Sequence, residues 1–418
     1  MKVFKFGGAS VKDADGVRNL LEVIRSEGQQ DLFVVVSAMG KTTNALEKVV
    51  SAYFHQKEAL NDALSEVEGF HHTIASDLFP HPEHPGRTVV KEHLSQLKSF
   101  LGSNKSQNHA FVYDQVVSVG ELISTSLVSA YLADKGMDNK WLDVRSCILT
   151  DDYYRSARVD WSATQEAIGK QVGFKGLTIT QGFLGAEKNN NFTTTLGREG
   201  SDYTAAIFAY CLNAESVTIW KDVPGVLNAD PRHFSETRLL NRISYREAIE
   251  LAFYGATVIH PKTLQPLQRK EIPLFVRSFK QYAEPGTCVG AGVDLDPDVA
   301  CFILKKDQVL LSLSSLDFSF MMEDNISQVF DLLHRYQMKV ELIQNSAISF
   351  SVCVDNKYNT LEPLLNKLRE KFKVTCYYGV TLYTIRHARP GDIEAMSREK
   401  EILLQQQSPD TVQLVVNE

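Results

Sequence analysis

Cysteine is scarce in this sequence, and the few cysteines are scattered. The 418-residue chain has six of them, and no two form a C-x-x-C pair. Most lie in apolar segments, which is typical of reduced thiols in the core of a cytoplasmic protein. We therefore expect a cytoplasmic location.

Membrane and export signals are absent as well. No stretch approaches 18 apolar residues, so the sequence predicts neither a membrane-spanning helix nor a membrane partner. The first apolar segment contains Lys2 and Lys5 and lacks the hydrophobic region of a signal peptide.

Long runs of positive charge are also missing. The net charge is −7, and no cluster of lysine and arginine is long enough to follow a phosphate backbone. Nucleic acid is therefore excluded as a partner. An acidic chain that binds anionic ligands must concentrate its cations locally. The length predicts two or three domains.

Several common catalytic motifs are not present. The segment Gly40-Lys41-Thr42 resembles the end of a P-loop, but the first glycine of that motif would have to stand at Val35. No G-x-G-x-x-G follows the pair Gly7-Gly8. No Ser-His-Asp or Cys-His pairing is evident, so a covalent acyl mechanism is not indicated.

What is present is the beginning of an α/β sheet. Residues 3–6 predict a strand, 17–24 an amphipathic helix, and the unbroken apolar segment Leu32–Val36 a strand buried on both faces. Ligands of such sheets bind beyond the carboxyl ends of the strands. Two loops, 7–10 and 37–44, leave those ends.

A third candidate loop spans Thr193–Asp202. It contains three threonines, two glycines, Arg198 and Asp202, and it leads into an apolar helix for which we expect Ser201 or Asp202 as the N-cap. Helix N-termini attract anions, and an arginine fork suits a carboxylate or a phosphate.

The composition changes after residue 284. Residues 284–297 are rich in Gly, Pro and Asp and predict a linker. Beyond them, strand–helix–strand–strand occurs twice, the second time shortened. We expect a catalytic domain over 1–285 and a tail over 296–418, with units at about 300–370 and 371–418. Open sheet edges of this kind often pair, which favours a homodimer.

Several cations are placed to act on a phosphoryl group. Transfer of such a group requires positioning and positive charge on its oxygens. Asp202 and Asp222 could orient lysines or approach Mg²⁺. The candidate cations are Lys5, Arg198, Lys221, Arg232 and Lys262.

These motifs, in this order, resemble the aspartate kinases of the amino-acid kinase family. The matching segments are 5–10, 36–38, 120–121, 194–198, 200–202, 222–225 and 230–232, and the resemblance extends to a tandem ACT-type tail. It implies a carbamate kinase-like three-layer α/β sandwich followed by two small ferredoxin-like α+β units. It also implies transfer of the γ-phosphoryl group of Mg-ATP to the β-carboxylate of L-aspartate. That reaction is the first step of lysine, threonine and methionine biosynthesis.

The resemblance also implies residue roles. Lys5 would bridge the ATP phosphates, held by Asp202, while Arg198 would bind the α-carboxylate of aspartate and Glu121 its ammonium group. The substrate pocket would be completed by Ser37, Thr43, Phe183 and Ser201. The nucleotide would be surrounded by Gly7, Gly8, Ser10, Lys221, Asp222, Arg232 and Lys262. Mg²⁺ would arrive with the nucleotide, without metal ligands from the protein.

Two positions depart from the family pattern. Ala9 stands where threonine is usual, and Glu199, where glycine is usual, puts an anion beside an anion-binding loop. The reaction that the resemblance implies is compatible with the residues present. The side chain of the substrate aspartate is already ionised at pH 7, so its carboxylate can attack without a general base.

The tail implies regulation by an amino acid. In the first unit, Met321-Met322, residues 340–343 and Ser346 are the expected effector features, although Ala347 stands where lysine-sensitive relatives tend to have glutamate. We expect a homodimer through the tails and feedback inhibition by lysine or, less favoured, threonine.

Two alternatives remain open. A kinase of the same fold that acts on a glutamate derivative or on UMP would share the glycine loops, but would be expected to lack the paired tail units. A non-catalytic amino-acid sensor would not need Lys5, Arg198 and Asp202 together.

Overall fold

The computed structural model describes residues 1–28, 30–173, 175–256, 259–317 and 319–417. The chain forms two compact units, and each draws on several segments. The first unit comprises Met1–Val226, Leu239–Ile249 and Val258–Pro297. The second comprises Leu227–Arg238, Glu250–Thr257 and Asp298–Glu418. The proposed domain bounds of 1–285 and 296–418 remain a prediction, and the second unit includes two short segments from the middle of the chain.

The first unit is built on an eight-stranded sheet with the strand order β3-β5-β2-β1-β8-β10-β11-β9. Its central strands β5, β2, β1, β8 and β10 run parallel. The strands are β1 (Lys2–Phe6), β2 (Leu32–Val36), β3 (Asn139–Leu142), β5 (Leu177–Gln181), β8 (Ser216–Lys221), β9 (Arg242–Ser244), β10 (Leu274–Ser278) and β11 (Thr287–Gly290). The segment predicted as a linker, 284–297, therefore contains a strand of this sheet.

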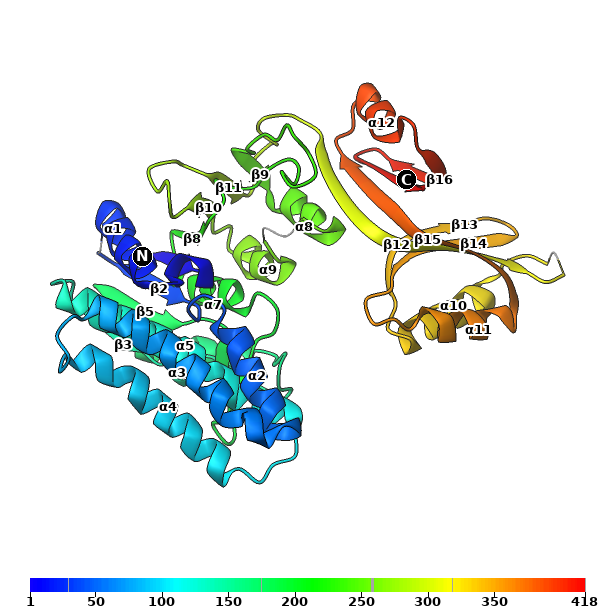
Figure 1. The fold of residues 1–418 in the computed structure, drawn as a ribbon. Coiled ribbons are helices and arrows are strands. Elements are labelled where there is room, and N and C mark those ends of the chain that lie inside the picture. The colour runs from blue at the N-terminus through cyan, green and yellow to red at the C-terminus, as the bar shows by residue number, and fades with distance from the viewer. Residues whose placement is uncertain (29, 174, 257–258, 318, 418) are drawn as a thin grey trace. The chain divides into compact units, whose positions relative to one another are not determined.

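Helices cover both faces of the sheet (Figure 1). On one face, Phe4, Phe6 and Val34 pack into a single apolar core with α1–α5. On the other face, Phe33 contacts Phe208 of α7, with ring centroids 4.3 Å apart, and α6 and α9 pack against α7. The helices are α1 (Ala14–Glu27), α2 (Thr42–His55), α3 (Leu60–Leu78), α4 (Pro85–Ser103), α5 (His109–Asp134), α6 (Trp161–Gln171), α7 (Gly200–Leu212), α8 (Tyr245–Tyr254) and α9 (Pro261–Arg269). The layer of helices on each face of the sheet confirms the predicted three-layer sandwich.

Helix α5 is long and apolar enough, by length and composition, to cross a membrane. The sequence contains no uninterrupted apolar run here, because small and polar residues are scattered through this helix. In the most apolar 18-residue stretch of α5, 78% is buried inside the protein, so α5 has the pattern of a core helix.

A small sheet lies beside the main one and has the order β4-β6-β7. Its strands are β4 (Leu149–Thr150), β6 (Leu184–Glu187) and β7 (Thr193–Thr195). The three threonines of β7 are buried, so the first part of the segment predicted as a loop is a strand that leads to Arg198.

The second unit contains a six-stranded antiparallel sheet with the order β13-β14-β12-β15-β17-β16. Its elements are β12 (Cys301–Ser315), α10 (Glu323–Arg335), β13 (Lys339–Asn345), β14 (Ser349–Asp355), α11 (Leu361–Arg369), β15 (Phe372–Arg386), α12 (Pro390–Ser397), β16 (Glu401–Ser408) and β17 (Thr411–Asn417). This sheet agrees with the predicted α+β tail.

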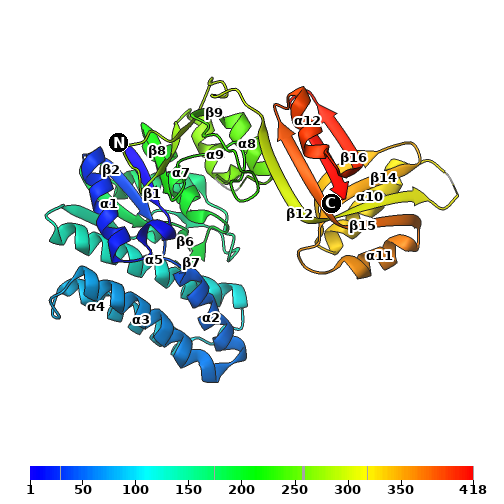
Figure 2. The same ribbon diagram turned by 45° about the horizontal axis from the view of Figure 1, so that its top comes forward.

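The two halves of that sheet share their central strands. Strands β12 and β15 pair along their whole length, with register shifts around Gln308. The half at residues 309–315 pairs with β14 and packs against α10 and α11, whereas residues 381–386 pair with β17 near α12 (Figure 2). The sequence predicted two consecutive strand–helix–strand–strand units, each with strands of its own. The structure instead has one long strand that serves both halves.

One glycine fixes how α5 meets the loop that follows β2. A Cβ atom at Gly120 would lie 2.9 Å from the Thr42 Cγ2 atom, 3.1 Å from the Leu46 Cδ1 atom and 3.2 Å from the Ala38 Cβ atom. The approach of α5 to α2 and to the β2 loop therefore requires a residue without a side chain at this point.

We predict that Gly120→Ala destabilises the protein by about 1–3 kcal/mol, because the added methyl group overpacks this contact. Gly69→Ala in α3 is the matched control, since a Cβ atom there meets nothing within 4 Å. The control should gain about 0.5–1 kcal/mol from helix propensity. Thermal unfolding of both variants measures the difference, and equal effects would contradict the steric argument.

Candidate active site

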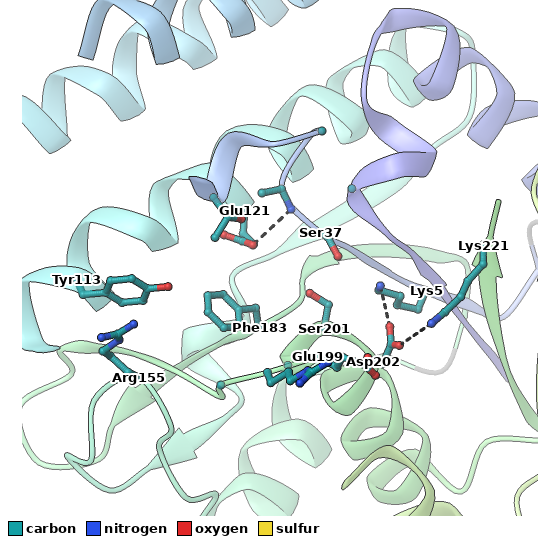
Figure 3. Close-up of a pocket in the computed structure, with 17 residues that line it drawn as sticks. Lys5, Ser37, Tyr113, Glu121, Arg155, Phe183, Glu199, Ser201, Asp202 and Lys221 are labelled. Carbon is teal, nitrogen blue, oxygen red and sulfur yellow. Dashed lines mark hydrogen bonds and ion pairs between the residues drawn. The ribbon is translucent and has the colours of Figure 1, made fainter. Parts of the chain in front are cut away.

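A cavity of about 500 Å³ opens at the carboxyl ends of β1, β2 and β8 in the first unit (Figure 3). Ten residues that the sequence predicted as site residues line it together. They are Lys5, Gly8, Ser37, Thr43, Glu121, Phe183, Arg198, Ser201, Asp202 and Lys221. Parallel strands bring these segments to one sheet edge although they are far apart in the sequence.

A buried ion pair lies at one end of the cavity. The Lys5 ammonium nitrogen is 2.7 Å from one carboxylate oxygen of Asp202, and the Lys221 nitrogen is 3.7 Å from the other. The Asp202 side chain is only 4% exposed. Burial raises the pKa of Asp202, but the two lysines outweigh burial, so that the pKa lies below its usual value. The carboxylate is therefore ionised and holds both lysines at the cavity.

The Asp202 carboxylate is positioned by the first turn of α7. This helix begins at Gly200, and its N-cap is Glu199 in the left-handed conformation, with φ 53°. The expectation that Ser201 or Asp202 is the N-cap was wrong, because the first helical turn already closes on the Glu199 carbonyl, which accepts from the N–H groups of Asp202 and Tyr203. Both residues instead lie in the first helical turn, where their side chains point into the cavity (Figure 3).

The two glycine loops after β1 and β2 pack directly on each other. The Gly40 N–H donates to the Gly8 carbonyl at 3.0 Å, and a Cβ atom at Gly8 would lie 2.8 Å from the Ala38 carbonyl oxygen. Only glycine allows this close approach. The Ser10 hydroxyl donates to the Trp220 carbonyl at 3.3 Å and so ties the first loop to β8.

Glu121 lies at the cavity wall, on α5, and is almost fully buried. One of its carboxylate oxygens accepts a hydrogen bond from the Ala38 N–H at 3.4 Å, and the other has no hydrogen-bond partner among the residues that the structure describes. Burial raises the pKa of Glu121 to about 8. This group is therefore mostly neutral at pH 7, until a cation binds beside it.

Five predicted residues do not line the cavity: Gly7, Ser10, Asp222, Arg232 and Lys262. Asp222 is exposed in the turn after β8, and Lys262 is exposed in the first turn of α9. Arg232 belongs to the second unit, where its guanidinium pairs with Asp230 at 2.6 Å. Their proposed nucleotide contacts remain predictions.

Two lining residues were missed by the sequence reasoning, Tyr113 and Arg155. Tyr113 precedes Glu121 by about two turns of the same helix, so helical spacing could have identified it. Arg155 lies in an irregular segment between β4 and α6, where no periodic pattern points to a cavity.

A protein metal site is not evident in the part of the chain that the structure describes. No group of three or more His, Cys, Asp or Glu side chains there could hold a metal ion.

The chain belongs to the amino acid kinase family, whose model matches residues 1–278. The match covers every strand of the first unit's sheet except β11, and all the residues that line the cavity. Within this family the chain belongs with the aspartokinases and is an ATP-dependent kinase. It is 35% identical over 363 residues to lysine-sensitive aspartokinase 3 of Escherichia coli, covering 86% of this chain and 79% of that protein.

Solved structures agree with this grouping. Escherichia coli aspartokinase III in complex with lysine and aspartate has a TM-score of 0.83 and 30% identity, and the match covers 100% of this chain and 96% of that chain.

A bifunctional aspartokinase/homoserine dehydrogenase of Arabidopsis thaliana is 29% identical, over 90% of this chain. The match spans only 42% of that longer protein.

The raised pKa of Glu121 predicts a stability that depends on pH. The carboxyl group of the unfolded chain has a pKa near 4.3, so the folded state opposes ionisation between about pH 4.5 and 8. Wild-type stability should therefore fall, relative to Glu121→Gln, as pH rises through this window. The variant should be more stable at pH 8 by on the order of a few kcal/mol, and the two should converge near pH 4.5.

Thermal unfolding of both proteins between pH 4.5 and 8.5 measures this difference. Glu58→Gln, at an exposed position, is the control and should show no pH-dependent difference. A constant offset between Glu121→Gln and the wild type at every pH would contradict the assignment.

Proposed function

We propose that the cavity catalyses transfer of the γ-phosphoryl group of Mg-ATP to the β-carboxylate of L-aspartate, which gives 4-phospho-L-aspartate. The observation that carries this proposal is the buried Lys5–Asp202–Lys221 cluster, which faces a cavity whose other wall holds Glu121. Lys5 and Lys221 supply positive charge for a phosphoryl group, and Glu121 supplies a site for an ammonium group. A solved structure of Escherichia coli aspartokinase III is a complex with aspartate and ADP, which supports an amino acid and an adenine nucleotide as the ligands.

Lys5 and Lys221 would stabilise the transferring group. Charge develops on the phosphoryl oxygens during transfer, and fixed cations in a site that excludes water stabilise it strongly. Asp202 holds the two ammonium groups in place before the substrate arrives. The acceptor carboxylate is already ionised at neutral pH, so the site needs no general base.

The substrate's amino-acid end would be held by Glu121 and Arg198. The unpartnered oxygen of Glu121 can accept from an ammonium group, whose charge would favour the ionised carboxylate. The guanidinium of Arg198 would bind the α-carboxylate. The remaining contacts would come from Ser37, Thr43, Phe183 and Ser201.

The nucleotide would lie over the glycine loops, next to Gly8 and Lys221. Mg²⁺ would arrive bound to the ATP phosphates and would neutralise part of their charge. The carboxylate of Asp202 is already engaged with two lysines, which agrees with a metal carried by the nucleotide rather than by a set of protein carboxylates. Gly7, Ser10, Asp222, Arg232 and Lys262 remain proposed nucleotide contacts.

We further propose a cytoplasmic homodimer whose tail binds lysine as feedback inhibitor. The similar relatives include a lysine-sensitive enzyme and a complex with lysine. Met321 is buried and Met322 exposed before α10, and the Ser346 and Ser349 hydroxyls lie 2.7 Å apart at the β13–β14 turn. Glu341 already pairs with Lys305 and Lys339, so it would support the effector region rather than bind the effector.

Replacing Lys5 tests the proposed reaction. Wild-type protein with ATP and aspartate should form the hydroxamate when hydroxylamine traps the acyl phosphate, and glutamate or UMP should not replace aspartate. Lys5→Met should lower kcat by about 10²–10³-fold, because one fixed donor at the transition state is lost.

Lys2→Ala is the control, at an exposed position on the same strand. Because Lys5→Met leaves Asp202 buried with one cation fewer, the double variant Lys5→Met/Asp202→Asn is measured too, since it removes both charges. Near-normal turnover in a folded Lys5→Met protein would exclude this phosphate site.

The regulatory proposal predicts that lysine inhibits the reaction and threonine does so less. An effector that prefers one of two protomer arrangements couples to activity by about 1–3 kcal/mol, or roughly 5–150-fold in affinity. Activity is measured against lysine and threonine, singly and together, in wild type, in Ser346→Ala and in the exposed control Ser408→Ala. Ser346→Ala should weaken the inhibition, while activity that ignores millimolar lysine and threonine would mean that the tail has no such role.

A further inference from the structure

Tyr113 and Arg155 lie at the end of the cavity that is far from Lys5 and Lys221 (Figure 3). The Arg155 guanidinium stacks on the Tyr113 ring, with its carbon 4.3 Å from the ring centroid. The Tyr113 hydroxyl donates to Glu47 at 2.8 Å, which fixes the ring. The ring in turn orients an arginine that is otherwise exposed at the cavity.

The backbone at Arg155 is held in an uncommon conformation. Its φ is 69°, in the left-handed region that a residue with a side chain seldom adopts. The Arg155 N–H donates to both carboxylate oxygens of Asp114, at 3.1 and 3.0 Å. Strained backbone that is held by a buried carboxylate occurs preferentially where the side chain has a function.

The same carboxylate joins Arg155 to the Arg198 loop. Asp114 also accepts from the Thr195 N–H and from the Thr195 hydroxyl, both at 2.8 Å. A Cβ atom at Gly197 would lie 3.3 Å from the Arg155 carbonyl oxygen. Two arginines therefore enter the cavity from adjoining segments.

The Arg155 guanidinium has hydrogen-bond donors to offer a ligand. Within the described ranges, no salt bridge connects it to a carboxylate. Two carboxylates of this region are engaged elsewhere, since Asp114 accepts from backbone N–H groups and Glu47 accepts from the Tyr113 hydroxyl. A guanidinium matches the two oxygens of a carboxylate in a bidentate geometry.

We propose that Arg155 binds the α-carboxylate of the substrate together with Arg198, and that this pair selects amino acids with a free α-carboxylate. The inference rests on the proposed function. Aspartate carries a carboxylate at each end. When its β-carboxylate faces the lysines, the α-carboxylate points to the opposite end, where the second guanidinium lies.

The test compares two substrates in the variant Arg155→Gly. One substrate is L-aspartate, and the other is its α-amide, which keeps the reacting β-carboxylate. Glycine adopts a positive φ without strain, so the variant should fold as well as the wild type. The KM for aspartate should rise about 10- to 100-fold while the KM for ATP stays unchanged, as expected for loss of a charged hydrogen-bond pair. With the α-amide, wild type and variant should differ by less than about 3-fold, because no charge pair remains to be lost.

Two further variants separate binding from structure. Arg155→Lys keeps the charge and should recover part of the affinity for aspartate, which a purely structural role would not explain. Arg158→Ala, at an exposed position of the same segment outside the cavity lining, should behave as wild type.

Each outcome decides one question. Turnover of aspartate by the wild type reports on the proposed function, and the ratio between the two substrates reports on Arg155. An unchanged KM for aspartate in a folded Arg155→Gly protein, or an equal loss with aspartate and with its α-amide, would overturn the inference.

Discussion

The ion pair between Lys5 and Asp202 determines how the first unit is arranged around its cavity. A lysine inside a strand and a carboxylate in the first turn of a helix can be buried only if they meet, because an isolated charge in the interior is very costly. Their contact at 2.7 Å fixes the start of α7 against the end of β1. Lys221 joins from β8, so one carboxylate serves two ammonium groups. The cluster of Lys5, Asp202 and Lys221 therefore carries two positive charges against one negative charge, which suits an anionic ligand.

Helix α5 provides the second half of the site through residues on one face. Asp114 and Glu121 are seven residues apart, or about two helical turns, so both point toward the cavity side. Burial raises the pKa of both groups, to about 6 for Asp114 and about 8 for Glu121. Burial is the largest cause in both groups, and the pKa of Asp114 stays lower because this group accepts hydrogen bonds from Arg155 and Thr195 and lies near the charge of Arg155. Asp114 thus serves as a structural connector, and Glu121 is left able to respond to a cationic ligand.

Much of the fold could be predicted from the sequence, because strong local patterns specify it. The apolar segment Leu32–Val36 is a buried strand with the predicted bounds, and the loops after β1 and β2 form the cavity. What could not be predicted depends on long-range contacts. The N-cap at Glu199 requires a left-handed residue that local propensity disfavours, and Arg155 reaches the cavity only because Asp114 binds its backbone. In the second unit the two halves share β12 and β15 (Phe372–Arg386), whose pairing contains a bulge. In the sequence, the residues at this bulge resemble the end of a strand.

Glu199 stands where glycine is usual in the family, and the charges around the cavity explain this difference. This carboxylate lines the cavity, and one of its oxygens is buried without a hydrogen-bond partner among the described residues. The cationic lining residues are Lys5, Arg155, Arg198 and Lys221. Against these four charges stand the carboxylates of Asp202 and Glu199, because burial keeps Glu121 mostly neutral at pH 7. The chain as a whole carries a net charge of −7, yet the cavity lining is positive by about two charges. Glu199 lowers that excess by one and is compensated by Arg155, the second guanidinium at the same cavity. A glycine at 199 would remove both the left-handed strain and this carboxylate, and the cavity would then hold cationic ligand groups less well.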